Sequence, residues 1–434
     1  MDKQVTKSYL YMFITTNLIV VMQMIAGALI GQFNGSDGVA AYSLAVVIPE
    51  ILLGLIMAIN YGMQAVCSKQ YGEGNMESAS KTFSLAFNWT IIINIVIGII
   101  LIVFGKEIAE LLGASGENEF LLKNTMNLIY TVPFISLTSG LFSILASVLY
   151  LKKEYKIAYI AIAIFFLLEC VTTAIMVHIT NSIAIFNYCL AFSTLVADLF
   201  MFHQLNKDKE NIHFTRITLK LKEFAKIFSI GAPELMTYFY YGIYNLFFNL
   251  YVLNKYNANI VSANAVGDNI TNIAEIFMLG ACLLTITLVG IEIGKNDKDG
   301  QEKVKKRMYK LFVISSIVFA VLFLASTNII ISLFIDEPNA TVQENIWIYM
   351  IFYCAGLPFY IFNCIAVSIY EVEGRIKESH LVYILQDLIL MIIFTILLDK
   401  LFGINGIWAA NLATQVLITT IILINNKKNL TKKI

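Results

Sequence analysis

The chain has 434 residues, of which 58% are hydrophobic and 14% charged, and its formal net charge is zero. Soluble domains are about 45–50% apolar, so this composition and a mean hydropathy of +0.75 exclude an ordinary soluble protein. No basic face is left over for nucleic acid, and we expect no nucleic-acid partner.

Twelve apolar runs are long enough to cross a bilayer as helices, which takes about 20 residues each. They are predicted near residues 8–32, 39–67, 82–104, 123–149, 157–179, 183–203, 224–253, 260–292, 308–333, 343–370, 379–399 and 404–426. The runs lack the two-residue alternation of barrel strands, so helices are favoured. The first run exceeds the roughly 7–15 apolar residues of a signal peptide and is read as an uncleaved helix. The sequence thus predicts an all-α integral membrane protein with twelve transmembrane helices.

The basic residues alternate along the chain. Of the 30 Lys and Arg, 26 lie in the termini and in every second connection, within residues 1–7, 69–81, 152–156, 207–226, 295–310, 375–377 and 427–433. The remaining four are Lys106, Lys123, Lys255 and Lys400. By the positive-inside rule, this pattern predicts a multi-pass protein of the cell membrane with both termini in the cytoplasm.

The chain reads as two halves. Gly72 and Gly294 end corresponding helices 222 residues apart, and Pro133 and Pro358, each followed by Phe, lie 225 residues apart. An even number of helices in each half gives both copies the same orientation, which predicts two six-helix lobes related by a parallel pseudo-two-fold repeat. We expect an N-terminal lobe at 1–206, a cytoplasmic basic linker at 207–223 and a C-terminal lobe at 224–434.

Gly62-Met63-Gln64-Ala65, followed by the turn from Ser68 to Ala79, resembles the multidrug and toxic compound extrusion (MATE) family. A weaker copy runs from Gly280 to Gly294, and Gly31-Gln32-Phe33-Asn34-Gly35 resembles the first hairpin of the family. The resemblance implies two lobes forming a V around a central cavity. It also implies export of organic cations in exchange for protons or sodium. We therefore expect a monomeric transporter, not an enzyme, with a cationic, amphipathic small-molecule substrate. No cofactor other than the coupling ion, H+ or Na+, and no metal are expected.

Carboxylates deep in membrane helices are candidates for ion coupling, because each costs about 2.5–3.5 kcal/mol on insertion scales. The candidates are Glu169, Glu50, Glu275 and Asp387. The resemblance places Glu169 at the Asp of a helix-5 motif, Asn-x-x-Leu-Asp-Pro, whose Asn and Pro are replaced by Phe165 and Cys170. Ala26 stands where many members carry a helix-1 Asp. The alternative for each acid is a structural, hydrogen-bonded role.

Candidates for the substrate cavity lie on the aromatic run at 224–253. They are Glu234, Tyr238, Tyr241, Tyr244 and Phe248. An aromatic face attracts a desolvated cation by up to about 2 kcal/mol per contact. The alternatives are rings that face lipid and a Glu234 that lies at the interface. Asp198, Asp268 and Glu292 lie nearer helix ends and are read as solvated.

Export of organic cations or drugs by proton or sodium antiport with alternating access is the leading hypothesis. One alternative is a flippase or exporter of lipid-linked saccharide or peptide. Another is an uncoupled MATE-like protein, which the absence of the helix-1 acid favours. The scarcity of basic residues at mid-membrane depth argues against lipid pyrophosphates. A membrane-embedded enzyme is disfavoured because the chain has no HExxH, DDxxD or GxxxxGK[ST] motif. The hypothesis of a non-transporting receptor or scaffold is left as a further alternative.

Overall fold

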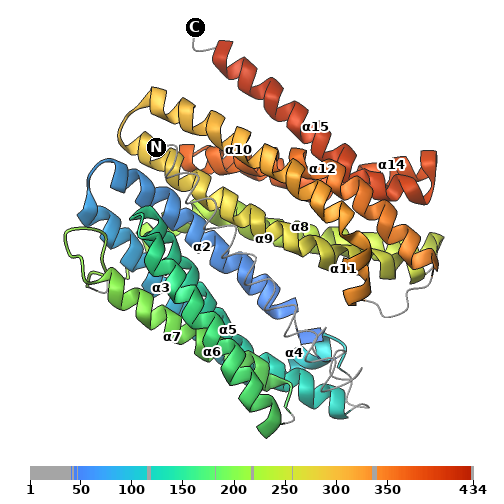
Figure 1. The fold of residues 1–434 in the computed structure, drawn as a ribbon, viewed down its shortest axis with the longest axis horizontal. Coiled ribbons are helices and arrows are strands. Elements are labelled where there is room, and N and C mark those ends of the chain that lie inside the picture. The colour runs from blue at the N-terminus through green and yellow to red at the C-terminus, as the bar shows by residue number, and fades with distance from the viewer. Residues whose placement is uncertain are drawn as a thin grey trace. The chain divides into compact units, whose positions relative to one another are not determined.

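The computed structural model of the protein describes residues 41, 44–45, 47–114, 119–180, 182–216, 219–256, 258–334 and 340–431. The described part is built of helices joined by turns and longer connections (Figure 1). Nine of its helices are long and apolar enough to cross a membrane. The predicted first helix at 8–32, with Ala26, lies outside the described residues. The chain forms two compact units, Met1–Leu235 and Met236–Ile434.

The first unit is a bundle around α5 (Glu119–Leu151), which packs against α2 (Val47–Gly72), α3 (Met76–Val103) and α7 (Ala184–Leu205). The same unit contains α4 (Gly105–Leu111), α6 (Tyr155–Ile179) and the start of α8 (Leu221–Lys255). α6 packs mainly against α7. The predicted linker at 207–223 falls within this unit, and the lobe boundaries at 206 and 224 stay predictions.

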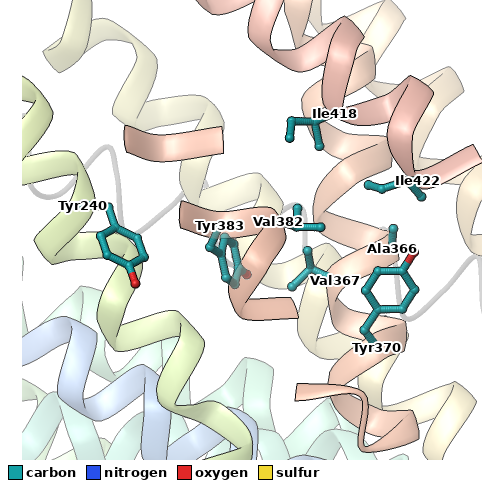
Figure 2. Close-up of a cluster of buried hydrophobic side chains, with 8 residues drawn as sticks. All are labelled: Tyr240, Ala366, Val367, Tyr370, Val382, Tyr383, Ile418 and Ile422. Carbon is teal, nitrogen blue, oxygen red and sulfur yellow. The ribbon is translucent and has the colours of Figure 1, made fainter. Parts of the chain in front are cut away.

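The second unit is organised around α12 (Ala340–Glu373), which packs against α9 (Ala258–Gly294), α10 (Lys298–Ala325) and α15 (Ile404–Thr431). It also contains the remainder of α8, α11 (Thr327–Phe334), α13 (Ile376–Ile384), the π-helical turn η1 (Leu385–Ile389) and α14 (Leu390–Phe402). Figure 2 shows one of its apolar clusters, in which Tyr240 of α8 belongs with residues of α12, α13 and α15.

Corresponding turns of the two units repeat the same backbone devices. Asn75 caps α3 by accepting a hydrogen bond from the amide of Ser78, and Asp297 caps α10 in the same way from the amide of Gly300. The residue before each cap, Gly74 or Asn296, has a positive φ of 77° or 55°. Such caps satisfy amides that the first helical turn leaves unpaired. The turn motif read in the sequence is therefore a helix stop followed by a helix start, present once in each unit.

Two predicted helices differ in detail from the structure. Within the run at 308–333, one helix ends at Ala325 and another begins at Thr327. The run at 379–399 contains the π-helical turn η1. α10 also begins well before residue 308, at Lys298. The hydropathy pattern marks the apolar part of a helix, whereas the capping residue Asp297 fixes where its backbone hydrogen bonds begin.

Candidate functional site

A cavity in the second unit combines acidic, amide and aromatic side chains from α8, α9, α12, η1, α14 and α15. Its carboxylates are Asp268 and Asp387. Its amides are Asn245, Asn264, Gln386, Asn411 and Gln415, and its rings are Tyr241, Tyr244, Phe248, Tyr349, Tyr353, Tyr360 and Trp408. Polar groups converging among aromatic walls are typical of small-molecule sites.

Asp268 of α9 is held by donors from two helices. The hydroxyl of Tyr349 donates to one carboxylate oxygen at 3.0 Å, and the amide of Asn264, one turn earlier on α9, donates to the other at 2.9 Å. Gly267 makes room for this arrangement, because a Cβ there would lie 2.8 Å from the ring of Tyr349. The donors fix the carboxylate at the cavity wall, where it presents negative charge to a ligand.

Stacked rings form the aromatic wall. Tyr349 lies nearly parallel to Tyr353, with centroids 6.1 Å apart, and meets Trp408 edge-on at 5.6 Å. The indole of Trp408 donates to Asn345 at 3.0 Å, and its other neighbour is Phe248 at 6.0 Å. Because the indole is tied to a buried amide, its ring cannot rotate freely. The cavity therefore offers ordered ring faces beside a carboxylate.

Asp387 belongs to the wide turn η1, which interrupts the helix formed by α13 and α14. Gln386 and Asp387 are neighbours in the chain, yet both line the cavity, and the Gln386 amide donates to the Asp387 carboxylate at 3.2 Å. π-helical turns inside α-helices are frequent at functional sites. This turn brings a second acid and an amide to the cavity.

Glu169 lies in the first unit, on the inward face of α6. Phe165, Glu169 and Thr173 are buried at four-residue spacing, whereas Leu167 and Val171 are exposed on the other side. The hydroxyl of Thr173 donates to one oxygen of Glu169 at 3.1 Å, and the other oxygen has no hydrogen-bond partner. Ser193 of α7 lies beside the carboxyl. The acid is thus buried inside the helix bundle, and its predicted role in coupling stays a prediction.

The other predicted site residues have different positions. Tyr241, Tyr244 and Phe248 line the cavity, Tyr238 is not among the lining residues, and Glu234 is a buried residue of the first unit. The side chains of Glu50 and Glu275 lie outside the described residues.

Sequence reasoning did not select Asp268. The available signal was the polar series Asn264, Asp268 and Thr271, which recurs at helical spacing within an apolar run.

The MatE family model matches residues 12–175 and 233–397. The chain belongs to the MatE family. The model matches once in each half, with an offset close to that of Gly72 and Gly294, so the predicted repeat is confirmed. The chain is a transmembrane transporter of the twelve-helix MATE fold.

Relatives and solved structures match over nearly the whole chain. The multidrug export protein MepA of Staphylococcus aureus (strain NCTC 8325 / PS 47) is 21% identical over 415 residues, covering 93% of this chain and 88% of MepA. MepA of Staphylococcus saprophyticus is 20% identical over 424 residues, covering 93% and 89%. A multidrug resistance MATE family transporter in an outward-facing conformation aligns with a TM-score of 0.89 at 14% identity, covering 99% of this chain and 96% of that one. A MOP superfamily transporter from Pyrococcus furiosus aligns at 0.87 with 15% identity and the same coverage.

Proposed function

We propose that this MatE protein is a secondary transporter that exports small organic cations by exchange with protons or sodium. The observation that carries the proposal is the pairing of Asp268 and Asp387 with ordered aromatic rings in one cavity. Carboxylates attract a cation, and ring faces bind its flat apolar body. The name of the relative MepA, a multidrug export protein, supports export of small molecules.

Exchange follows from competition for the same acids. A carboxyl group removed from water favours its protonated form, whereas a bound cation favours the carboxylate. A proton or sodium ion and an organic cation then weaken each other's binding, and this reciprocal coupling is what an antiporter needs. We propose that this competition takes place at Asp268 and Asp387, and that Glu169 binds a further proton in the first unit.

The basic connections support a cell-membrane protein whose basic face and termini are cytoplasmic. Alternating access to the two sides would then export a substrate taken from the cytoplasm or the inner leaflet. The protein would work as a monomer, with the coupling ion as its only other requirement.

Transport of lipid-linked saccharides or of peptides is the second candidate. A pyrophosphate group needs cationic partners, as Arg and Lys provide. The described residues that line the cavity include two acids and neither Lys nor Arg. This charge favours an organic cation over an anionic lipid carrier.

Transport by purified protein in liposomes tests the proposal. Movement of a fluorescent lipophilic cation, ethidium, is followed under an imposed proton gradient and then under a sodium gradient. We expect gradient-driven movement in the wild type, its loss in Asp268→Asn and Asp387→Asn, and its retention in Glu292→Gln. Glu292 is a matched control because it is an acid of the same helix, α9, paired with Lys295 at 2.7 Å outside the cavity.

Two outcomes contradict the proposal. Unchanged movement in both aspartate variants would exclude the cavity as the cation site. Absence of movement under either gradient, from protein shown to be folded, would exclude cation antiport and favour lipid-linked or peptide cargo.

A further inference from the structure

The first unit contains a second buried acid, Asp198 on α7, about one and a half helical turns beyond Ser193. Its residue is 3% exposed, and neither carboxylate oxygen has a hydrogen-bond partner. Within the described residues, no Lys, Arg or His lies close enough to form an ion pair with it. The sequence pattern suggested a solvated residue near a helix end, and the structure instead buries it.

The elements that the structure describes as packed against α7 supply no countercharge. α6 brings Glu169, another acid, and an exposed Lys156 near its start. The buried Lys152 at the end of α5 lies 3.2 Å from Glu154 and 3.8 Å from Asp208.

α3 approaches α7 through the stacked rings of Phe87 and Phe202, and its own charged residues, Glu77 and Lys81, pair with each other at 2.5 Å. His203, about one and a half turns further along α7, is the remaining titratable group of this helix end. Among the described residues, none of these groups pairs with Asp198, so its carboxyl is buried without a countercharge.

An ionised carboxylate is not tolerated in such a place. Burial without hydrogen bonds or a countercharge costs many kcal/mol, so a group of this kind takes up a proton instead. Asp198 is then a neutral acid in the resting protein. It can release its proton only when water or a carrier reaches it, which is the property of a proton relay in a membrane helix.

We propose that Asp198 is a proton-binding site in series with Glu169, placed between Glu169 and the basic face of the membrane. Ser193 lies beside Glu169, and α7 continues from there through Asp198 to Leu205 and the basic connection. Five residues of helix span about 7.5 Å. Because Ser193 and Asp198 also point about 140° apart around the helix, a chain of water molecules is needed to carry a proton between the two acids.

This proposal rests on the proposed proton exchange and describes the route by which the proton reaches the cytoplasm. In each cycle the Asp198 acid gives its proton to water at the basic face, and its carboxylate is then reprotonated by the Glu169 acid. Only O–H bonds break and form, and no other reactant is required.

Infrared spectroscopy tests the resting state without transport. Protein labelled with 13C-aspartate, in lipid nanodiscs at neutral pH, is compared with Asp198→Asn and with Thr194→Val. Thr194 is a matched control because it is a buried polar residue of the same helix, bonded only to the carbonyl of Leu190 at 2.7 Å. We expect Asp198→Asn to lose part of the isotope-shifted C=O band of protonated aspartate, and Thr194→Val to retain it.

Asp198→Glu keeps the test decisive if the asparagine variant does not fold. Its labelled band should fall by the same amount, with a new unlabelled carboxylic band in its place. An unchanged labelled band in either folded variant would mean that Asp198 is ionised, and the proposal would be wrong.

Transport separates the relay from the proposed function. Asp198→Asn should bind ethidium as the wild type does but slow proton-driven exchange roughly a hundredfold, the lower end of what a positioned proton-transfer group contributes. Asp198→Glu should restore part of the rate. Wild-type exchange in Asp198→Asn would overturn the relay and leave antiport standing. Failure of the wild type to exchange protons would overturn the antiport itself, even with the infrared band present.

Discussion

Lys255 and Asp399 join the end of α8 to the end of α14, with the ammonium nitrogen 2.5 Å from a carboxylate oxygen. The side chain of Asp399 is fully buried, whereas that of Lys255 is 44% exposed. Tyr251 and Tyr256 donate to the same carboxylate. Burial and this carboxylate raise the pKa of Tyr256 to about 12, so its hydroxyl remains a donor near neutral pH. One of the few basic residues outside the basic connections therefore stabilises a buried acid.

Removing Lys255 should destabilise the second unit. Lys255→Met leaves the buried carboxylate with only its two tyrosine donors, and loss of a hydrogen bond to a charged group costs about 1.5–3 kcal/mol. We expect a lower thermal unfolding midpoint in detergent. Asp399→Asn in the same background should recover part of the loss, because the unpaired charge is gone. Lys400→Met, which removes an exposed neighbour, is the control and should unfold as the wild type does. Equal midpoints for Lys255→Met and Lys400→Met would contradict a stabilising ion pair.

A close approach between the backbones of α2 and α8 explains why the motif near the end of α2 contains Gly62. A Cβ at Gly62 would lie 2.0 Å from the carbonyl oxygen of Ile227, and one at Gly231 would lie 2.0 Å from that of Ala58. The two backbones cross with no space for a methyl group. Gly62→Ala should therefore lower stability by about 1–3 kcal/mol through overpacking.

The control for this packing prediction is Gly242→Ala. A Cβ at Gly242 meets no atom within 4 Å, and alanine favours a helix by about 1 kcal/mol over glycine. The two variants should shift the unfolding midpoint in opposite directions. A Gly62→Ala protein as stable as the wild type would show that the helices separate at no cost.

The sequence was sufficient to predict features that recur along the chain. Apolar length placed most helices, and the spacing of Gly72 and Gly294 predicted the repeat that the two capped turns display. Such features depend on local composition and backbone chemistry. The same pattern placed Glu169 deep in a membrane helix, and the structure buries it beside Thr173.

Tertiary contacts explain what the sequence did not predict. Asp268 was read as solvated, and its principal donor, Tyr349, belongs to another helix that no local pattern connects to it. The π-helical turn around Asp387 has no signal such as Gly or Pro. Segment 207–216 also looked polar, yet the backbone amides of His213 and Thr215 bond to Ser80 and Ser84 of α3. Each of these depends on a partner distant in the sequence.

Gly267 should control the shape of the cavity. Gly267→Ala places a methyl group 2.8 Å from the ring of Tyr349, so the ring must move and its hydrogen bond to Asp268 must lengthen. We expect ethidium binding to weaken about tenfold, which corresponds to about 1.4 kcal/mol. Fluorescence titration of the purified protein measures this change.

Gly356→Ala is the control for the cavity prediction, because its methyl group would meet Leu412 at an ordinary 3.5 Å. It should bind ethidium as the wild type does. If Gly267→Ala also kept wild-type affinity, the position of the Tyr349 ring would have no part in binding.

The π-helical turn should be required for binding but not for folding. Deletion of Ile389, a partly exposed residue of η1, allows the wide turn to close into a regular α-helix. Because successive residues of an α-helix point about 100° apart, Gln386 and Asp387 should then no longer face the cavity together. We expect the deletion variant to unfold near the wild-type midpoint and to lose most of its affinity for ethidium. Ile389→Ala, which keeps the chain length, should bind normally, and Asp387→Asn should show the effect of losing the acid alone. A deletion variant with wild-type affinity would mean that the turn does not position these side chains.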